Sequence, residues 1–233
     1  KPWLKKWRQF KANQYRYALD YRELPSVYLK QFGIKIDEYV KHHHSHMAGG
    51  YYTAPFNNAM TLTIDAIGEM ETMTIWDNEK MIARQQYPLS LGLLYSAMTQ
   101  RIGLKPNEEE YITMGMAAYG KPMFSEYIKT FLLKRNNHKG IGNVLEWAKK
   151  EDLAASVQYV YEKELERIVK KYCKKINLVL SGGCALNCVA NTNLKRNIWI
   201  MPNPGDSGSS LGCIPAVTKE RLNWKGPFLG YNI

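Results

Sequence analysis

The chain has 233 residues, of which 45% are hydrophobic and 12% aromatic, so it can bury the core of one large domain or two lobes. This composition excludes a disordered chain, and no apolar run approaches the roughly 20 residues that cross a bilayer. The formal net charge of +11 is spread over residues 1–41 and 121–175, without the aromatic interleaving of a nucleic-acid surface. We therefore predict a cytoplasmic protein with a solvated basic surface and neither a membrane nor a nucleic acid as partner.

The cysteines and the first residue give two further expectations. No cysteine has the paired C-x-x-C spacing of a structural zinc site, and a chain of this size needs no disulfides. We expect reduced, buried thiols at Cys173, Cys184, Cys188 and Cys213. The chain starts with Lys1 in KPWLKKWRQFK, which holds no strand that would open a domain, so we expect truncation at the N-terminus.

The N-terminal part of the chain predicts helices, a histidine-rich segment and a hairpin. Residues 3–32 have loose helical periodicity that Pro25 interrupts, which predicts two short helices. A short strand over residues 39–41 is expected to run into a helix that starts with the histidines. Apolar residues alternate with threonines within residues 61–80, which predicts a hairpin whose turn holds Asp65, Gly68 and Glu69.

The rest of the chain predicts an α/β fold. Residues 88–103 have apolar side chains at helical spacing, which indicates an amphipathic helix with its apolar stripe in the core. Residues 124–175 are helical and charged, with a loop over 136–143. Buried strands are expected near residues 176–180 and 197–202, and each leads through a glycine turn into a helix. Strand, glycine turn and helix in succession are typical of α/β proteins.

Two histidines and two aspartates form a candidate metal site. His42 and His46 are four residues apart, so on a helix their imidazoles share one face and can meet one ion. Asp65 follows a strand and Asp206 lies in a glycine-rich turn. This ligand set suits a divalent ion such as iron, manganese or zinc. The alternative is structural: a surface histidine cluster, and aspartates that open turns or cap a helix.

A second candidate site holds a nucleotide. Gly182 and Gly183 follow Ser181 between a strand and a helix, where free backbone N–H groups and a positive helix end suit a phosphate. Asn187 and Asn191 are four apart on that helix and would face the same ligand. The alternative is an ordinary strand-to-helix turn. No G-x-G-x-x-G or P-loop pattern occurs, so neither a Rossmann nor a Walker-type site is predicted.

Six ordered motifs between residues 42 and 212 resemble the carbamoyltransferases of the nodulation-protein and antibiotic-biosynthesis type: HHHSHMAGGYYTAPF, TLTIDAIGE, PLSLGLLYSAMT, EEYITMGMAAYG, LSGGCALNCVAN and PGDSGSSLG. The resemblance implies an actin-like ATPase (ribonuclease-H-like) fold, with two α/β lobes around a cleft. It implies one core domain over residues 1–233, in which 1–103 are the remainder of the first lobe and 104–233 the second lobe. The adenylate-forming domain, which usually follows this core in the family, would be absent.

The same resemblance implies a chemistry. Family members make carbamoyl-adenylate from ATP and carbamoyl phosphate, then transfer the carbamoyl group to a hydroxyl of a small molecule. A divalent metal would assist, with iron expected ahead of manganese or zinc, and a homodimer is compatible with the pattern. His43 would help to deprotonate the acceptor hydroxyl. The resemblance places the metal ligands at His42, His46, Asp65 and Asp206, and the nucleotide contacts at Gly182, Gly183 and Asn187.

Two positions depart from the family pattern, and two alternative functions stay open. Ala66 stands where the family usually has glycine, and Ile112 where many members have lysine. More seriously, the N-terminal strand of the family and its adenylate-forming domain would be absent, so we expect this chain to bind better than it catalyses. The alternatives are a tRNA threonylcarbamoyl-transfer protein, which the charge of +11 slightly favours, and a non-catalytic nucleotide-binding domain without metal dependence. The motifs GGCALNCVAN and YSAMT favour O-carbamoyl transfer.

Overall fold

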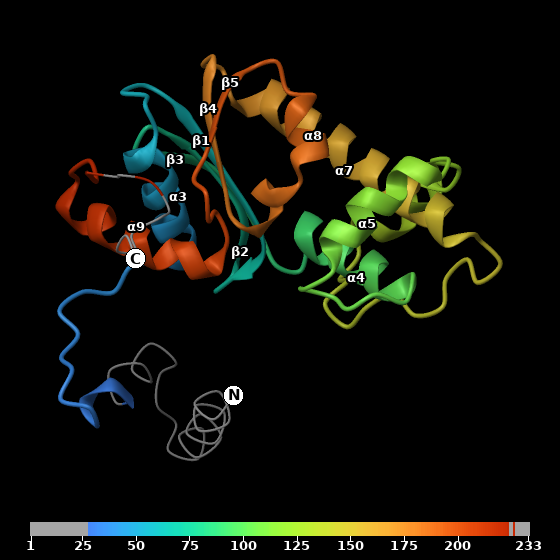
Figure 1. Ribbon diagram of the computed structural model, residues 1–233, viewed down its shortest axis with the longest axis horizontal. Coiled ribbons are helices and arrows are strands. Elements are labelled where there is room, and N and C mark those ends of the chain that lie inside the picture. The colour runs from blue at the N-terminus through green and yellow to red at the C-terminus, as the bar shows by residue number, and fades with distance from the viewer. Residues whose placement is uncertain (1–27, 224–225, 227–233) are drawn as a thin grey trace, which may run out of the picture. The chain divides into compact units, whose positions relative to one another are not determined.

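The computed structural model describes residues 28–223 and residue 226 (Figure 1). Its contacts divide the chain into one unit over residues 1–39 and another over 40–233. In the first unit, the described residues hold one helical turn over residues 28–30. The two short helices predicted over residues 3–32 lie almost entirely outside the described residues.

The second unit is built on a five-stranded mixed sheet in the order β3-β2-β1-β4-β5. β1 pairs antiparallel with β2 and β2 antiparallel with β3, whereas β1, β4 and β5 run parallel. The α/β prediction is therefore confirmed. The strands are β1 (Met60–Gly68), β2 (Glu71–Asp77), β3 (Lys80–Gln86), β4 (Asn177–Ser181) and β5 (Asn197–Ile200).

Helices cover both faces of this sheet (Figure 1). α3 (His42–Thr53) and α9 (Asp206–Thr218) lie on one face, and the long α7 (Lys150–Tyr172) and α4 (Leu91–Arg101) lie on the other. α5 (Glu110–Met116) packs against α7 and α4. The shorter elements are η2 (Ala117–Tyr119), α6 (Ser125–Tyr127), the π-helix η3 (Ile128–Leu132), η4 (Gly183–Leu186) and α8 (Cys188–Thr192).

Strand alternation separates two hydrophobic cores. Leu178 and Leu180 of β4 belong to the core shared with α4 and α7, whereas Val179 belongs to the core under α3 and α9. β1 follows the same rule, because Leu62 and Ile64 point into the α4–α7 core. The predicted core stripe of α4 is confirmed, since its buried apolar residues are Leu91, Leu94, Tyr95, Ala97 and Met98.

Helices α3 and α9 pack with their backbones close together. A Cβ built on Gly212 of α9 would overlap the carbonyl oxygen of Ser45 in α3, and a Cβ on Gly49 would lie 3.4 Å from the Gly212 Cα. Only glycine permits this approach. The contact brings the first residue of α9 beside the first turn of α3.

Four sequence expectations need correction. Residues 39–41 form no strand, because the backbone is extended at Lys41 but α3 begins at the next residue. Asp65 lies within β1 at a break in its register with β2, not in the hairpin turn. The helix after Gly183 is only a short 3-10 turn followed by the five-residue α8, so no long helix points its N-terminus at a ligand. All four cysteines are free, but Cys173 alone is buried; Cys184 is half-buried, and Cys188 and Cys213 are exposed.

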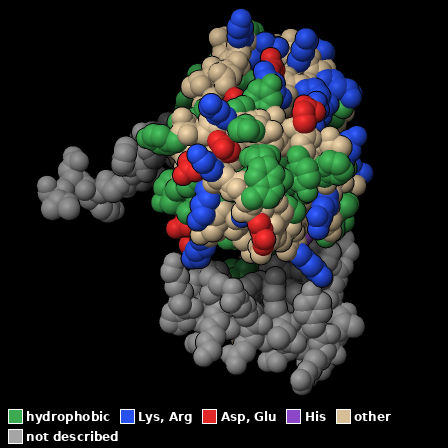
Figure 2. Space-filling view, turned by 90° about the vertical axis from the view of Figure 1, so that its right-hand side faces the viewer, with side chains coloured by type: hydrophobic (Ala, Val, Ile, Leu, Met, Phe, Trp, Pro, Cys, Tyr) green, Lys and Arg blue, Asp and Glu red, His purple; other side chains and the backbone are tan. Residues whose placement is uncertain are grey.

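The surface agrees with a dispersed positive charge. Lysine and arginine side chains are scattered over the face in Figure 2, interspersed with acidic and hydrophobic side chains rather than gathered in one stripe. Within the described ranges, none of the helices combines the length and the apolar character needed to cross a membrane.

Candidate metal centre and adjoining pocket

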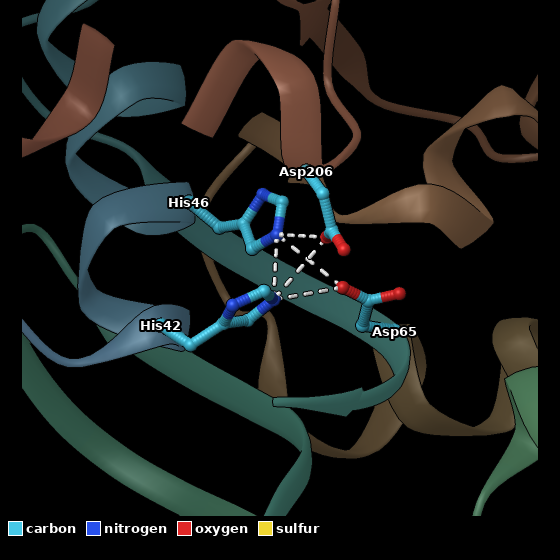
Figure 3. A group of neighbouring side chains, drawn as sticks. All are labelled: His42, His46, Asp65 and Asp206. Carbon is cyan, nitrogen blue, oxygen red and sulfur yellow. Dashed lines mark hydrogen bonds and ion pairs between the residues drawn. The ribbon is translucent and has the colours of Figure 1, made fainter. Parts of the chain in front are cut away.

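Three secondary-structure elements bring the four predicted metal ligands to one place (Figure 3). His42 and His46 lie one turn apart at the start of α3. Asp65 follows the buried part of β1, and Asp206 opens α9 just after β5. Because β1, β4 and β5 are parallel, their carboxyl ends share one edge of the sheet, which is where ligand sites of α/β proteins form.

The four ligand atoms converge closely. His42 Nε2 lies 3.1 Å from Asp65 Oδ2 and 3.0 Å from His46 Nε2. Both Nε2 atoms lie 3.3 Å from Asp206 Oδ1, and His46 Nε2 lies 3.3 Å from Asp65 Oδ2. Ligand atoms about 2.0–2.1 Å from a tetrahedral ion stand about 3.3 Å from one another. The donor set and its spacing therefore fit one divalent ion.

The centre is closed on one side and open on the other. The His46 side chain is 1% exposed and that of Asp65 13%, whereas that of Asp206 is 74% exposed. A closed set of four protein ligands is typical of structural metal sites, and an accessible side is typical of sites that also bind substrate. His46 Nδ1 is buried and has no hydrogen-bond partner among the described residues.

Without an ion, protonated histidines offset the negative charge of the two carboxylates. Hydrogen bonds to Asp206 and Asp65 raise the pKa of His42 to about 9. Burial opposes the charged form of His46, but hydrogen bonds to the same carboxylates outweigh it and raise its pKa. Burial likewise opposes ionisation of Asp65, yet its bonds to the two histidines hold its pKa well below the usual range. A divalent cation would take the place of these protons.

Residues at the start of α4 contact the backbone around Asp65 and fix its position. The Ala66 N–H donates to Asp65 Oδ1 at 2.8 Å, which leaves Oδ2 for the centre. The Ser90 hydroxyl donates to the Ala66 carbonyl at 2.6 Å and accepts from the Leu93 N–H as the cap of α4. A Cβ on Gly92 would lie 2.8 Å from the Asp65 carbonyl oxygen. The start of α4 thus fixes the path of the chain that carries Asp65.

The other two histidines point elsewhere, as their helical positions predict. His43 is buried and its Nδ1 lies 3.1 Å from Thr74 Oγ1, which also accepts from Trp76 Nε1. Burial lowers the pKa of His43 to about 4, so the ring is neutral at neutral pH. His44 stacks on the Trp76 ring at 5.4 Å between centroids. His43 as the base that deprotonates the acceptor stays a prediction.

A pocket of about 730 Å³ opens beside the centre, and some of the residues predicted to contact the nucleotide line it. Asp65, Asp206, Gly183 and Asn187 all line it. Gly182 does not: its N–H donates to the Pro204 carbonyl at 2.9 Å, and its φ of 85° and close approach to β1 require glycine. Gly182 therefore lets the backbone pass close to the Ile64 carbonyl of β1 just before Gly183.

The asparagines of α8 have different surroundings. Asn187 caps α8 through its bond from the Ala190 N–H and lines the pocket. Asn191 is buried, and its Nδ2 donates to the Ala185 carbonyl at 2.8 Å. The expectation that both face one ligand is therefore wrong.

Sequence reasoning missed the residues that orient Asn187. Gln158 of α7 forms a reciprocal amide pair with Asn187, with N···O distances of 2.9 and 3.0 Å. The Tyr95 hydroxyl of α4 donates to Gln158 Oε1 at 2.8 Å, and Tyr95 also lines the pocket. Gln158 is buried on the apolar face of α7. In the sequence, an uncharged polar residue at an apolar position of a helix could have indicated a buried hydrogen bond.

Comparison with known proteins identifies a family and several relatives of this chain. The family described as carbamoyltransferase N-terminus matches residues 5–149 and 137–214. An uncharacterized protein of Synechocystis is 33% identical over 78% of this chain and 36% of its own length. Nodulation protein NolNO of Sinorhizobium fredii is 26% identical over 84% of this chain and 34% of its own length, and nodulation protein U of Azorhizobium caulinodans is 25% identical over 80% and 34%.

A solved structure supports the fold alone. Component A of the (R)-2-hydroxyglutaryl-CoA dehydratase of Acidaminococcus fermentans superposes with a TM-score of 0.54 at 14% identity, over 78% of this chain and 69% of that chain.

The fold and site define an α/β protein with a cluster of two histidines and two aspartates beside a pocket. The chain belongs to the carbamoyltransferase N-terminal family. It spans 34% to 36% of the length of the Synechocystis and nodulation-protein relatives.

Proposed function

We propose that this chain forms the metal-binding core of an O-carbamoyltransferase, which transfers a carbamoyl group from carbamoyl-adenylate to a hydroxyl of a small molecule. The observation that carries the proposal is the convergence of two imidazole nitrogens and two carboxylate oxygens at the mouth of the pocket, in a chain of the carbamoyltransferase family. ATP and carbamoyl phosphate are the proposed precursors of the adenylate.

Mixed imidazole and carboxylate ligands suit iron, manganese and zinc. We propose iron ahead of the other two on the family resemblance. A bound divalent ion would supply positive charge that polarises carbamoyl or phosphate oxygens. The hydrogen bond from the Ala66 N–H would orient the Asp65 carboxylate. The buried His46 would exclude water from one side of the centre. The exposed side at Asp206 is the proposed side of substrate entry.

The nucleotide is proposed to lie in the adjoining pocket. Its volume of about 730 Å³ is within the range of about 300–1,000 Å³ of small-molecule sites. Gly183 would permit close approach of a phosphate, and one amide hydrogen of Asn187 remains for the ligand after its pairing with Gln158. Gly182 does not line the pocket, but its close contact with the backbone of β1 positions the adjacent Gly183.

The finer architecture is also a proposal. The actin-like arrangement, with lobes divided near residue 103, follows from the family resemblance. β1 to β3 lie before this boundary in the sequence, and β4 and β5 lie after it. All five strands form one sheet, so the two proposed lobes would share a sheet and a hydrophobic core.

The decisive experiment is metal content of the purified chain, measured by elemental analysis after gentle dialysis. We expect near-stoichiometric iron, manganese or zinc in the wild type and its loss in His46→Ala. The exposed His138 lies outside the centre, so His138→Ala is the matched control and should keep the metal.

Binding of an ATP analogue separates this proposal from a non-catalytic nucleotide-binding domain. We expect the affinity to fall in His42→Ala and Asp65→Ala, because the metal would contact the phosphates. Unchanged affinity in both variants, with no metal in the wild type, would support the non-catalytic alternative.

A further inference from the structure

A second cavity lies on the other side of the sheet from α3 and α9. Its volume is about 660 Å³, and its walls come from the β1–β2 hairpin, the π-helix η3 and the middle of α7. It shares no lining residue with the pocket beside the metal centre. Ile64 faces this cavity and the next residue, Asp65, faces the centre, because successive side chains of a strand point to opposite faces.

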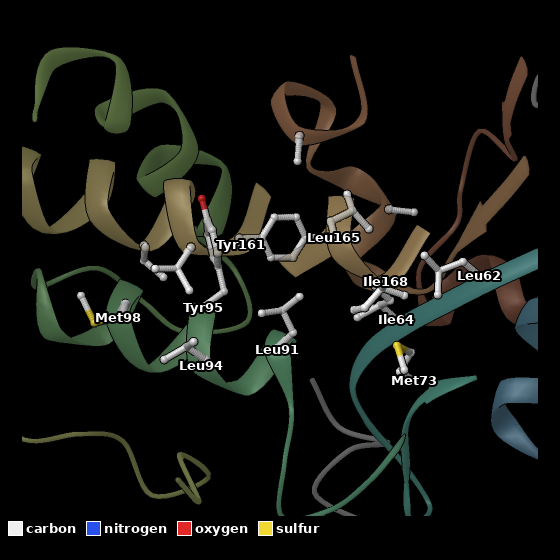
Figure 4. Close-up of a cluster of buried hydrophobic side chains, with 14 of the residues drawn as sticks. Leu62, Ile64, Met73, Leu91, Leu94, Tyr95, Met98, Tyr161, Leu165 and Ile168 are labelled. Atoms are coloured by element: carbon white, nitrogen blue, oxygen red, sulfur yellow. The ribbon is translucent and has the colours of Figure 1, made fainter. Parts of the chain in front are cut away.

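The inner wall of the cavity is apolar. Ile64 of β1, Met73 of β2 and Ile168 of α7 turn toward one another between the sheet and α7, with Leu91 beside them (Figure 4). All four are part of the main hydrophobic core. Thr72 and Gln85 also line the cavity, but the Thr72 hydroxyl and the Gln85 amide N–H both donate to the Leu89 carbonyl. A ligand group that lies against Ile64, Met73 and Ile168 should therefore be apolar.

The rim of the cavity is cationic. Lys129, Lys134 and Arg167 line it together with one acid, Glu164. Glu164 is engaged by Arg167 at 2.7 Å, so the charges of that pair cancel. Lys129 is 3.8 Å from the exposed Glu126, and Lys134 has no ion-pair partner among residues 28–223. Both lysine side chains are exposed at the mouth of the cavity, and a ligand carboxylate would compete only with the solvent-exposed Glu126 for Lys129.

We propose that this cavity binds a small amphipathic anion, with an apolar chain against Ile64, Met73 and Ile168 and a carboxylate between Lys129 and Lys134. Apolar burial supplies the attraction for the chain, and the net positive rim selects an anionic head over a neutral or cationic one. This ligand differs from the nucleotide proposed for the other pocket, because the apolar side chains of the inner wall suit a hydrocarbon chain better than a base or a sugar. The proposal does not depend on the carbamoyl-transfer chemistry.

Methyl NMR of the full chain with decanoate as the probe tests the proposal and locates the ligand. Met73 lines this cavity and Met114 lines the pocket of the metal centre, so their methyl signals report on the two sites separately. We expect decanoate to shift the Met73 signal saturably and to leave Met114 unchanged. Decanol should bind more weakly and decylammonium more weakly still.

The lysine pair supplies the matched variants. In Lys129→Gln/Lys134→Gln, decanoate affinity should fall about tenfold at low ionic strength while decanol affinity stays within about twofold. Lys195→Gln removes a lysine that does not line the cavity and should change neither. Both variants alter exposed side chains, so unaltered methyl spectra of the free proteins will show that they fold.

Three results would overturn the proposal: no shift of Met73 with decanoate, a shift of Met114 in its place, or equal affinity for decanoate and decylammonium. The first would mean that the cavity binds no such chain. The second would assign the chain to the pocket of the metal centre, and the third would remove the role of the cationic rim.

Discussion

Asp65 Oδ2 lies 3.1 Å from His42 Nε2, although the two residues are 23 positions apart and belong to different elements. The contact depends on the register of β1, because a shift of one residue would turn Asp65 to the opposite face of the sheet. A largely enclosed carboxylate held in this way is harder to replace than the exposed carboxylate of Asp206.

We predict that Asp65→Asn abolishes tight metal binding. The amide keeps the shape of the side chain but removes the charge that a divalent cation needs. The loss of affinity should exceed the roughly 10–100-fold that removal of a supporting residue costs. Competition with a chelating dye measures it. Asp206→Asn should lose less, because that carboxylate is 74% exposed and water can replace it; an equal loss in both variants would contradict the ranking.

Replacement of Ser90 should affect both the fold and the centre. Ser90→Ala removes the cap of α4 and the hydrogen bond to the Ala66 carbonyl. We expect the free energy of unfolding to fall by about 0.5–2 kcal/mol, which is the usual range for a lost helix cap, and metal affinity to fall with it. Urea unfolding and chelator competition measure the two effects. Ser210→Ala, at an exposed position in α9, should change neither.

The sequence predicted the elements with strong periodicity and missed those without it. Alternation of apolar residues with threonines located β1 and β2, and helical spacing located α4. β3 was missed because Lys80–Gln86 is a mostly exposed edge strand without alternation of apolar and polar residues, and it forms by pairing with β2. The strand expected at residues 39–41 failed for the converse reason, since an extended segment without a partner forms no strand.

The candidate centre was predictable in part. The spacing of His42 and His46 places two imidazoles on one helical face, which is local information. That Asp206 joins them follows from the close packing of α3 on α9, which spacing along the chain cannot show. The residue types and the family resemblance both suggested the set of four, and the structure shows that the four ligand atoms lie close together. Gln158 was missed because its partner Asn187 is 29 positions away.

Gln158 should act on the nucleotide and not on the metal. Gln158→Leu keeps the volume but leaves Asn187 and the Tyr95 hydroxyl without their buried partner. We expect weaker binding of an ATP analogue, with metal content unchanged, and a loss of about 1–3 kcal/mol in stability for the unpaired groups. Calorimetric titration and elemental analysis separate the effects. Loss of metal in this variant would contradict a role confined to Asn187.

Two glycines form a matched test of the α3–α9 contact. Gly212→Ala places a Cβ on the Ser45 carbonyl oxygen, so we expect a loss of about 1–3 kcal/mol in the free energy of unfolding. Gly115 of α5 has no heavy atom within 4 Å of an added Cβ, so Gly115→Ala should be neutral or stabilise by up to about 1 kcal/mol. Urea unfolding compares them. Equal effects would show that the close approach of the helices is not a constraint.

Removal of the metal should lower stability without unfolding the chain. The two hydrophobic cores do not include the four ligands, so the fold does not depend on the ion as a zinc finger does. An ion that binds the folded state alone stabilises it by about 2.7 kcal/mol at a free concentration of 100 times Kd. Thermal unfolding with the metal and with EDTA should therefore differ by several degrees in Tm. The difference should vanish in His46→Ala and persist in His138→Ala, because only the first variant loses a ligand; a shift that survives in both would place the ion somewhere other than this centre.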